Sequence, residues 1–484
     1  GGAVILGSQG VNTIIQLTST IVLARLLSPD DYGVIAMVMA VTGFARLFRD
    51  LGLSAAAVQK KELSRDLQTN LFWINVAMGA LLTLTVAAAA PFVGMFYKKP
   101  ELVPVTAVLS LSFTISSLGT QHGAGLVRGM KFGRKESAGI VGTMVALVVA
   151  MILAFRGFSY WALVWSSLAG NFATTVLLFV FSNFRPGLPS RRSGVRELLR
   201  FGVNITAFEF VNYFHRNLDN IVIGRFCGPA SLGLYSRAYS LLMLPINSIR
   251  GPINSVGFPA LSKLQNNPVE FRNYFRKATC FLALVSMPLT TFLAIASEPL
   301  IRLLLGEKWN GIAPIFSVLA VVAFIQPTVT LWGMVVLSRG MGKRYLQIGI
   351  FNTVCSAIGF LAGLPWGAMG VAVGYAISTY VTTYPILVWA FHGTPLRFRD
   401  FSEVIARPFI ASIVAAIICY FTILTLNEIQ NIFWVATVGF IYSILYLGVI
   451  RMLPGGQSDF HYLIGLARHF TQRFRLPALL KSAN

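Results

Sequence analysis

Four polar residues recur at helical spacing inside an otherwise apolar segment, residues 203–224. Glu209, Asn212, Arg216 and Asp219 are separated by three, four and three positions, so a helix places all four on one face. A charged side chain near a bilayer centre costs roughly 2.5–3.5 kcal/mol, so such residues usually face a cavity. A guanidinium there suits an anion such as a phosphate, because it offers two parallel charge-assisted hydrogen bonds and stays ionised.

We therefore predict that Arg216 and Asn212 bind an anionic substrate, and that Glu209 and Asp219 are candidate sites for a coupling H+ or Na+. An alternative stays open for Arg216 and Asp219, which at a spacing of three could form an ion pair that only holds helices together. A milder polar stripe lies 200 positions earlier, in an apolar segment spanning residues 3–24. Its members are Gln9, Asn12, Gln16 and Ser19, of which we assign Asn12 and Gln16 to substrate binding.

Further arginines lie in or next to apolar segments. Arg46 and Arg49 lie in the apolar segment 33–57, toward its cytoplasmic end. Arg237 and Arg250 lie near the outer and inner ends of the segment 233–257. All four are predicted to bind phosphate or glycan through the same guanidinium chemistry. For Arg46 and Arg49 an equal alternative is that their side chains extend to the lipid headgroups.

Composition decides which elements carry these residues. Of the 484 residues 55% are hydrophobic and 12% are charged, with a mean hydropathy of +0.70, whereas soluble domains are about 25% charged. A soluble enzyme, a disordered chain and a coiled coil are therefore excluded. Runs of about 20 apolar residues, each able to cross a bilayer as a helix, recur about fourteen times. They lie near 3–24, 33–57, 70–96, 102–120, 137–155, 159–182, 203–224, 233–257, 279–305, 311–338, 345–364, 367–391, 404–426 and 431–450.

The formal charge of +22 is unevenly divided between the loops. Alternate loops, together with the tail, carry most of the Lys and Arg, so the positive-inside rule places both termini in the cytoplasm. The excess positive charge then reflects the orientation of the chain in the membrane, and we predict no nucleic-acid partner. The four cysteines have no close spacing and predict neither a disulfide nor a metal site. The phosphate-binding loop of ATPases and the common catalytic motifs are also missing from the sequence, so we expect no enzyme activity and no bound cofactor.

An internal repeat organises the chain. Residues 25–33 and 225–233 share Arg-x-x-x-Pro-x-x-x-Gly at an offset of 200. We predict an all-α polytopic membrane protein with two six-helix lobes, related by a pseudo-twofold axis along the membrane normal, and substrate bound between them. The expected division is an N-lobe at 1–182, a cytoplasmic linker at 183–200, a C-lobe at 201–391, two extra helices at 392–452 and a basic amphipathic cytoplasmic tail at 453–484.

Residues 24–33, Ala-Arg-Leu-Leu-Ser-Pro-Asp-Asp-Tyr-Gly, and 48–53, Phe-Arg-Asp-Leu-Gly-Leu, resemble the start of bacterial polysaccharide transporters. These are Wzx-type flippases of the multidrug/oligosaccharidyl-lipid/polysaccharide exporter superfamily. Residues 225–233 are similar to the corresponding motif of the second half. The resemblance extends over nearly the whole chain in span number and loop length.

This resemblance implies a multi-pass protein of the bacterial inner membrane that flips undecaprenyl-pyrophosphate-linked oligosaccharide for exopolysaccharide, capsule or O-antigen. It implies alternating access of a cationic central cavity, driven by H+, Na+ or the membrane potential. It also implies membrane lipids, a polysaccharide polymerase and a chain-length regulator as partners. The extra helix pair at 392–452 resembles that of lipid-II-type flippases, where it helps form a lipid groove. The alternative is a cation-coupled multidrug exporter of the same superfamily.

Overall fold

The computed structural model of the protein describes residues 2–50, 64–189, 195–425 and 432–457. Within these ranges all regular elements are helices, as predicted. Nine helical segments in this part of the chain are long and apolar enough to cross a bilayer. The chain is therefore a multi-pass membrane protein, and the number of fourteen spans stays a prediction.

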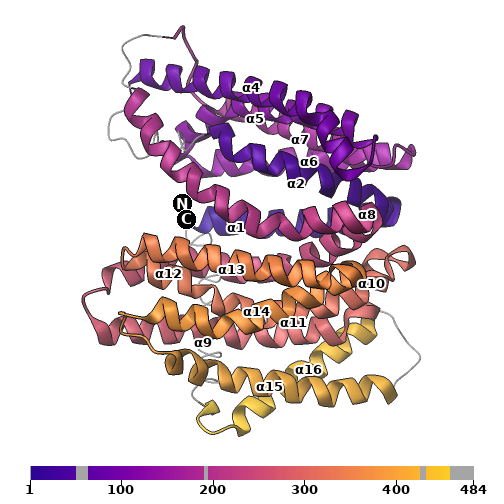
Figure 1. The fold of residues 1–484 in the computed structure, drawn as a ribbon, viewed down its shortest axis with the longest axis vertical. Coiled ribbons are helices and arrows are strands. Elements are labelled where there is room, and N and C mark those ends of the chain that lie inside the picture. The colour runs from indigo at the N-terminus through magenta and orange to yellow at the C-terminus, as the bar shows by residue number, and fades with distance from the viewer. Residues whose placement is uncertain (1, 51–63, 190–194, 426–431, 458–484) are drawn as a thin grey trace, which may run out of the picture. The chain divides into compact units, whose positions relative to one another are not determined.

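Figure 1 shows the helices in chain order. They are α1 (Gly2–Leu26), α2 (Pro29–Asp50), α4 (Arg65–Tyr97), α5 (Leu102–Arg128), α6 (Phe132–Phe155), α7 (Trp161–Phe181), α8 (Val195–Lys263), α9 (Pro268–Ile295), α10 (Ser297–Leu305), α11 (Ile312–Val329), α12 (Leu331–Ser338), α13 (Gly342–Gly363), α14 (Gly367–Phe391), α15 (Phe398–Thr425) and α16 (Ile432–Met452).

Breaks in the helical backbone can be compared with the predicted spans at two places. Non-helical backbone at Gly228 (φ 84°, ψ 176°) forms a kink in α8 where two helices meet, between the spans predicted at 203–224 and 233–257, and glycine meets no steric penalty there. The single span predicted at 279–305 is wrong, because α9 ends at Ile295 and α10 begins at Ser297. Pro299 favours the break, since it lacks a donor N–H and loses no hydrogen bond when it lies in the first turn of the new helix α10.

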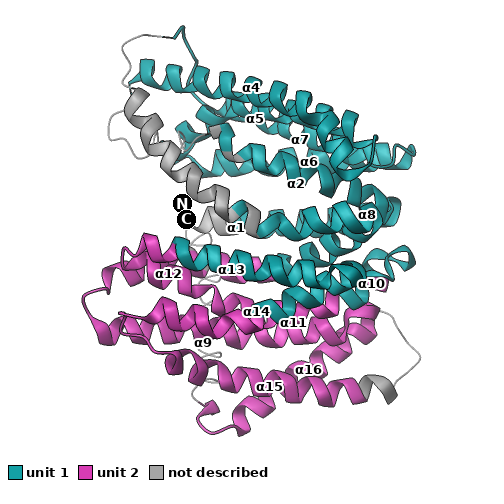
Figure 2. Cartoon of the chain, viewed as in Figure 1, with its two compact units in different colours: residues 1–244, 304–315, 346–379 teal, residues 245–303, 316–345, 380–484 magenta. Residues whose placement is uncertain are grey.

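The chain forms two compact units, coloured separately in Figure 2. Unit 1 contains residues 1–244, 304–315 and 346–379, and unit 2 contains residues 245–303, 316–345 and 380–484. The units follow spatial contact, and the lobes, the linker and the extra helix pair defined from the repeat stay predictions. The tail predicted from residue 453 lies almost wholly outside the described residues.

Small residues bring α6 and α7 of unit 1 into backbone contact. A Cβ on Gly142 would lie 2.8 Å from the carbonyl oxygen of Gly170, and one on Gly170 would lie 2.9 Å from that of Gly142. Neither position accepts a side chain without separating the helices. Close approach at small residues is a common way to pack helices in lipid, where no hydrophobic effect drives association.

Helices α13 and α14 are also in backbone contact through glycines, at two positions on each helix. Gly359 and Gly363 face Gly374 and Gly370, and a Cβ on any of the four would overlap the backbone of the opposite helix. The spacing of four within each helix is the small-xxx-small pattern of membrane helix pairs. A 3-10 turn at Leu364–Trp366 separates the two helices, at the point where the sequence predicted a boundary.

The core of unit 2 lies where α9, α15 and α16 meet. Ala411, Ala415 and Cys419 of α15 pack against Val438 and Tyr442 of α16. Tyr446 of α16 donates a hydrogen bond to the carbonyl oxygen of Leu284 in α9 at 3.0 Å. Burial of the phenol is thus compensated by a hydrogen bond, as lipid-embedded packing requires. The two C-terminal helices are therefore fastened to α9 rather than isolated in the bilayer.

Candidate functional site

The predicted polar stripe lies on α8, whose side chains are described from Tyr213 onward, with gaps. Arg216 is exposed, whereas Asp219 is buried. Asp219 accepts hydrogen bonds from the Tyr235 hydroxyl at 2.9 Å and from the Asn220 amide at 2.8 Å. No ion pair joins Arg216 to Asp219 within this part of the chain, so the structure does not favour the alternative of a self-neutralised pair.

The side chains of Glu209 and Asn212 lie outside the described residues. On α1, Asn12 is half-buried and Gln16 is exposed. Both stripes therefore keep exposed polar groups at corresponding repeat positions, Gln16 and Arg216.

Helices α2 and α8 pack along each other in unit 1. The Tyr213 hydroxyl donates to the carbonyl oxygen of Ala40, and its ring lies 6.0 Å from that of Phe44. Eleven residues later, a Cβ on Gly224 would lie 3.2 Å from the side chain of Met37. This packing brings Arg46, on α2, and Arg216, on α8, onto adjacent helices.

The remaining predicted arginines differ in their surroundings. Arg46 is exposed and Arg49 is half-buried. Arg250 is half-buried and belongs to unit 2. The guanidinium of Arg237 lies 3.9 Å from the ring centroid of Tyr32, a cation–π contact. Arg237 is thus engaged with an aromatic side chain, which the sequence pattern did not predict.

The two copies of the repeated loop motif pack against each other in unit 1. A Cβ on Gly33 would overlap the carbonyl oxygen of Pro229, and a Cβ on Gly233 would overlap that of Pro29. The contact is reciprocal at the repeat offset of 200, so each glycine is required by the proline of the other copy. We call Asp31, Tyr32, Gly33, Gly233, Arg237 and Trp309 the loop cluster.

Aromatic and polar contacts hold the loop cluster together. The Trp309 ring meets Tyr32 edge-on, with centroids 5.4 Å apart, and its indole N–H donates to the carbonyl oxygen of Ala24 at 2.7 Å. Trp309 is fully buried. Asp31 accepts hydrogen bonds from the Ser28 amide at 2.8 Å and from the Ser159 hydroxyl. The beginning of α2, the part of α8 that follows Gly228, and the turns at Ser159 and Trp309 are therefore joined within unit 1.

A cluster of buried polar side chains that the sequence pattern did not predict lies between α4 and α5. Asn75, Gln121 and His122 are at most 1% exposed, and their side-chain nitrogen and oxygen atoms have no hydrogen-bond partner within the described residues. About two turns away, Thr83 and Thr114 are paired at 2.9 Å. The signal was present as polar residues in apolar runs, but only packing distinguishes paired from unpaired ones.

Within the described residues, no group of three or more His, Cys, Asp or Glu could hold a metal ion. The functional groups are arginines, amides, hydroxyls and aromatic rings. This donor set can bind anions and sugars by hydrogen bonding and stacking.

Comparison with known proteins gives related transport and biosynthesis proteins. The chain is 26% identical over 420 residues to the lipopolysaccharide biosynthesis protein WzxC of Escherichia coli (strain K12), covering 84% of this chain and 83% of the relative. It is 27% identical over 414 residues to the teichuronic acid biosynthesis protein TuaB of Bacillus subtilis (strain 168), covering 84% and 85%.

Solved structures share the fold. The lipid II flippase MurJ in an inward closed conformation has a TM-score of 0.74 at 13% identity, covering 93% of this chain and 97% of that one. An inward-facing multidrug resistance transporter of the MATE family has a TM-score of 0.63 at 17% identity, covering 81% and 95%. The model of the polysaccharide biosynthesis protein family matches residues 22–314, more than half of the sequence, and the chain belongs to that family.

Proposed function

We propose that the protein is a flippase that moves undecaprenyl-pyrophosphate-linked oligosaccharide from the cytoplasmic to the outer leaflet of the bacterial inner membrane. The product would supply exopolysaccharide, capsule or O-antigen synthesis, with a polymerase and a chain-length regulator as partners. Both termini would lie in the cytoplasm. The observation that carries the proposal is Arg216, exposed and without an ion pair among the described residues, on α8, which packs against the helix carrying Arg46.

The relatives support this substrate class. Two of them are named for lipopolysaccharide and teichuronic acid synthesis, and a third is a succinoglycan biosynthesis transport protein of Rhizobium meliloti (strain 1021), 22% identical. The solved structures support the proposed extra helix pair. MurJ covers 93% of this chain, whereas the inward-facing MATE transporter covers 81%, so this chain shares more of its length with the MurJ fold. We infer that α15 and α16 lie beside the lipid tail of the substrate.

Two features support the proposed duplication. The loop motifs of the two halves contact each other reciprocally through Gly33 and Gly233. In addition, the last helix pair of each proposed lobe, α6–α7 and α13–α14, is joined by glycine-to-backbone contacts. Two six-helix lobes related by a pseudo-twofold axis account for both. Because six is an even number, both lobes would enter the membrane in the same direction.

The arginines would solve the central energetic problem of translocation. A diphosphate moved through hydrocarbon would lose its hydration, at a cost of tens of kcal/mol for a bare charge in a low dielectric. Arg216 and Arg46 would replace that hydration with charge-assisted hydrogen bonds. Asn12, Gln16 and Asn212 would add neutral hydrogen bonds to sugars, and the polyprenyl tail would stay in the lipid.

The loop cluster would be the outer seal in the cytoplasm-facing state. Opening would separate Gly33 from Pro229 and Gly233 from Pro29, and would draw Tyr32 away from Arg237. The cluster lies at loops that the positive-inside rule places outside. Glu209 and Asp219 remain the proposed H+ or Na+ sites. Asp219 accepts a hydrogen bond from Tyr235, which lies on the other side of the break at Gly228. Protonation or ion binding at Asp219 would therefore change a contact close to the seal.

A cell-based complementation assay tests the anion site. In a strain lacking its own flippase, we expect Arg216→Ala to abolish most surface polysaccharide at normal protein level, and Arg216→Lys to retain part of it because the charge remains. Arg156→Ala, at an exposed loop arginine, is the matched control and should transport normally. Normal output from Arg216→Ala would overturn the assignment of Arg216.

The competing function is cation-coupled export of small molecules, favoured by the fold shared with the MATE transporter. Purified protein in liposomes separates the two. Efflux of a lipophilic cation dye driven by a Na+ or H+ gradient, without any effect of lipid-linked oligosaccharide, would support the exporter. Competition of that oligosaccharide with the dye, or its translocation alone, would support the flippase.

A further inference from the structure

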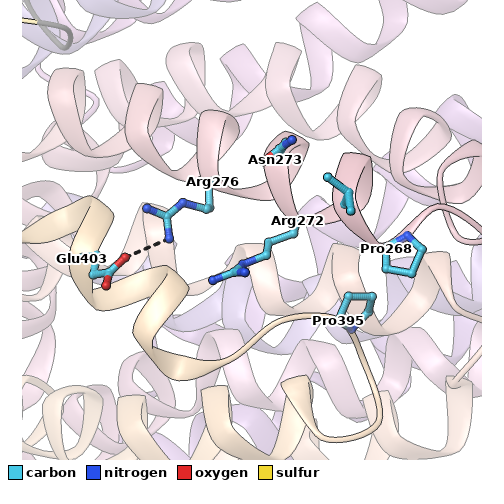
Figure 3. A pocket seen from close by; sticks show the side chains of 7 residues that line it. Pro268, Arg272, Asn273, Arg276, Pro395 and Glu403 are labelled. Atoms are coloured by element: carbon cyan, nitrogen blue, oxygen red, sulfur yellow. Dashed lines mark hydrogen bonds and ion pairs between the residues drawn. The ribbon is translucent and has the colours of Figure 1, made fainter.

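A charged cavity in unit 2 lies where two helices begin side by side. It has a volume of about 500 Å³ and is lined by residues of the first turns of α9, by Pro395 and by Glu403 of α15 (Figure 3). Asn267 caps α9 by accepting a hydrogen bond from the Glu270 amide at 3.2 Å. Asp400 caps α15 by accepting one from the Arg397 amide at 2.9 Å. Two helix N-termini, each favourable to negative charge, therefore adjoin the cavity.

The ion pairs around the cavity leave positive charge in excess. Asp400 is fully buried and binds Arg272 Nε at 2.5 Å and Arg276 Nη1 at 3.0 Å. Arg276 also binds Glu403 at 3.0 Å, and Glu403 binds Arg399 at 2.6 Å. Three guanidiniums thus share two carboxylates in this network. One positive charge is not balanced by any member of the network.

Arg272 is the guanidinium best placed to bind a further anion. Its ion pair with Asp400 uses Nε, and its side chain is 49% exposed. Figure 3 shows Arg272 and Arg276 extending from α9 toward the loop and first turn of α15, with Arg272 beside the cavity. The two terminal nitrogens of Arg272 can then donate in parallel to two oxygens of one phosphate, the geometry in which arginine is most selective.

We propose that this cavity binds the phosphodiester of an anionic phospholipid from the cytoplasmic leaflet. The loops around it belong to the set that the positive-inside rule places in the cytoplasm, and basic pockets between membrane helices on that side bind anionic headgroups. A single excess charge matches a monoanionic diester. Pro268, Val269 and Pro395 give one side of the cavity an apolar surface for the glycerol backbone.

Binding here would attach the α9–α15 junction to the leaflet from which the proposed substrate enters. Because Arg272, Arg276 and Asp400 join α9 to α15, a lipid bound to Arg272 would hold both helices at one depth. The site uses none of the residues assigned to transport, so it does not depend on the proposed function.

Lipid binding to the full-length protein tests the proposal. Native mass spectrometry, or titration of purified protein, would compare phosphatidylglycerol with zwitterionic phosphatidylcholine. Val269→Glu adds a carboxylate at the cavity from a position that is 67% exposed, so folding should be unaffected. Asn266→Glu makes the same charge change at an exposed residue outside the lining and is the matched control.

We expect phosphatidylglycerol to bind Val269→Glu about tenfold more weakly than Asn266→Glu, as a like charge a few ångströms away predicts. Glu403→Gln removes a competing carboxylate and should tighten binding several-fold. Equal affinities of the two glutamate variants would overturn the proposal, as would unchanged or weaker binding to Glu403→Gln. Inorganic phosphate displacing the lipid at equal concentration would overturn the assignment to a lipid headgroup.

Discussion

Substituting Gly33 or Gly233 with alanine should break the seal that the repeated loops form. A Cβ at either position would lie well inside 3.0 Å of a proline carbonyl oxygen on the other loop, a distance that real Cβ atoms essentially never show. The obstacle is backbone, not the end of a flexible side chain. The two loops must therefore move apart by at least about 1 Å, which disturbs a tightly packed region.

The expected magnitude follows from the contacts that are lost. Overpacking a close-packed site typically costs about 1–3 kcal/mol. Separation of the loops also weakens the contact of Arg237 with Tyr32, worth about 0.5–2 kcal/mol. Gly139→Ala is the control, because a Cβ there meets nothing within 4 Å and alanine favours a helix by up to about 1 kcal/mol. The midpoint temperature of thermal unfolding in detergent should fall for Gly33→Ala and should stay the same or rise for Gly139→Ala.

Maleimide labelling of Cys227 reports the opening directly. Cys227 is half-buried and directly precedes the helix break at Gly228. With the other three cysteines replaced by serine, an impermeant maleimide added outside cells should label Cys227 faster in Gly33→Ala than in Gly139→Ala. Equal labelling rates together with equal thermal stability would refute the reasoning that these loops form a tight seal.

Three further sets of substitutions test separate features. A double-mutant cycle of Tyr32→Leu and Arg237→Met should give a coupling of about 0.5–2 kcal/mol in thermal unfolding, and additive effects would contradict the cation–π contact. Gly374→Leu should destabilise the α13–α14 pair by about 1–3 kcal/mol or more, while Gly349→Leu, with nothing within 4 Å of its Cβ, should be tolerated. Asn75→Leu combined with Gln121→Leu should leave stability unchanged or raise it, because unpaired polar atoms are removed; a clear loss of stability would show that these amides have partners.

Apolar run length predicted most helices well, because a bilayer fixes how many residues a span needs. It also left a gap around Gly228, between the spans predicted at 203–224 and 233–257, where α8 is kinked. It failed at Ala296, where α9 ends inside the single span predicted at 279–305. The end of a helix depends on local backbone geometry and neighbouring contacts that hydropathy does not contain.

Spacing placed Arg216 and Asp219 on the same helix but could not distinguish their environments. One is exposed, and the other is buried against Tyr235, sixteen residues away. The shared Arg-x-x-x-Pro-x-x-x-Gly motif was visible in the sequence, but the sequence did not predict that its two copies pack against each other. Trp309, which completes it, comes from a turn nearly three hundred residues further along the chain.

Reconstituted translocation is the most direct test of the central claim that this protein moves a lipid-linked glycan between leaflets. Purified protein in liposomes would be given undecaprenyl-pyrophosphate oligosaccharide, and an enzyme added outside would modify only the glycans in the outer leaflet. We predict that wild-type protein makes nearly all the glycan accessible within minutes, and that Arg216→Ala leaves about half protected, as expected for an even distribution between leaflets without flipping. Protection that is the same with wild-type protein, Arg216→Ala and protein-free liposomes would contradict the account.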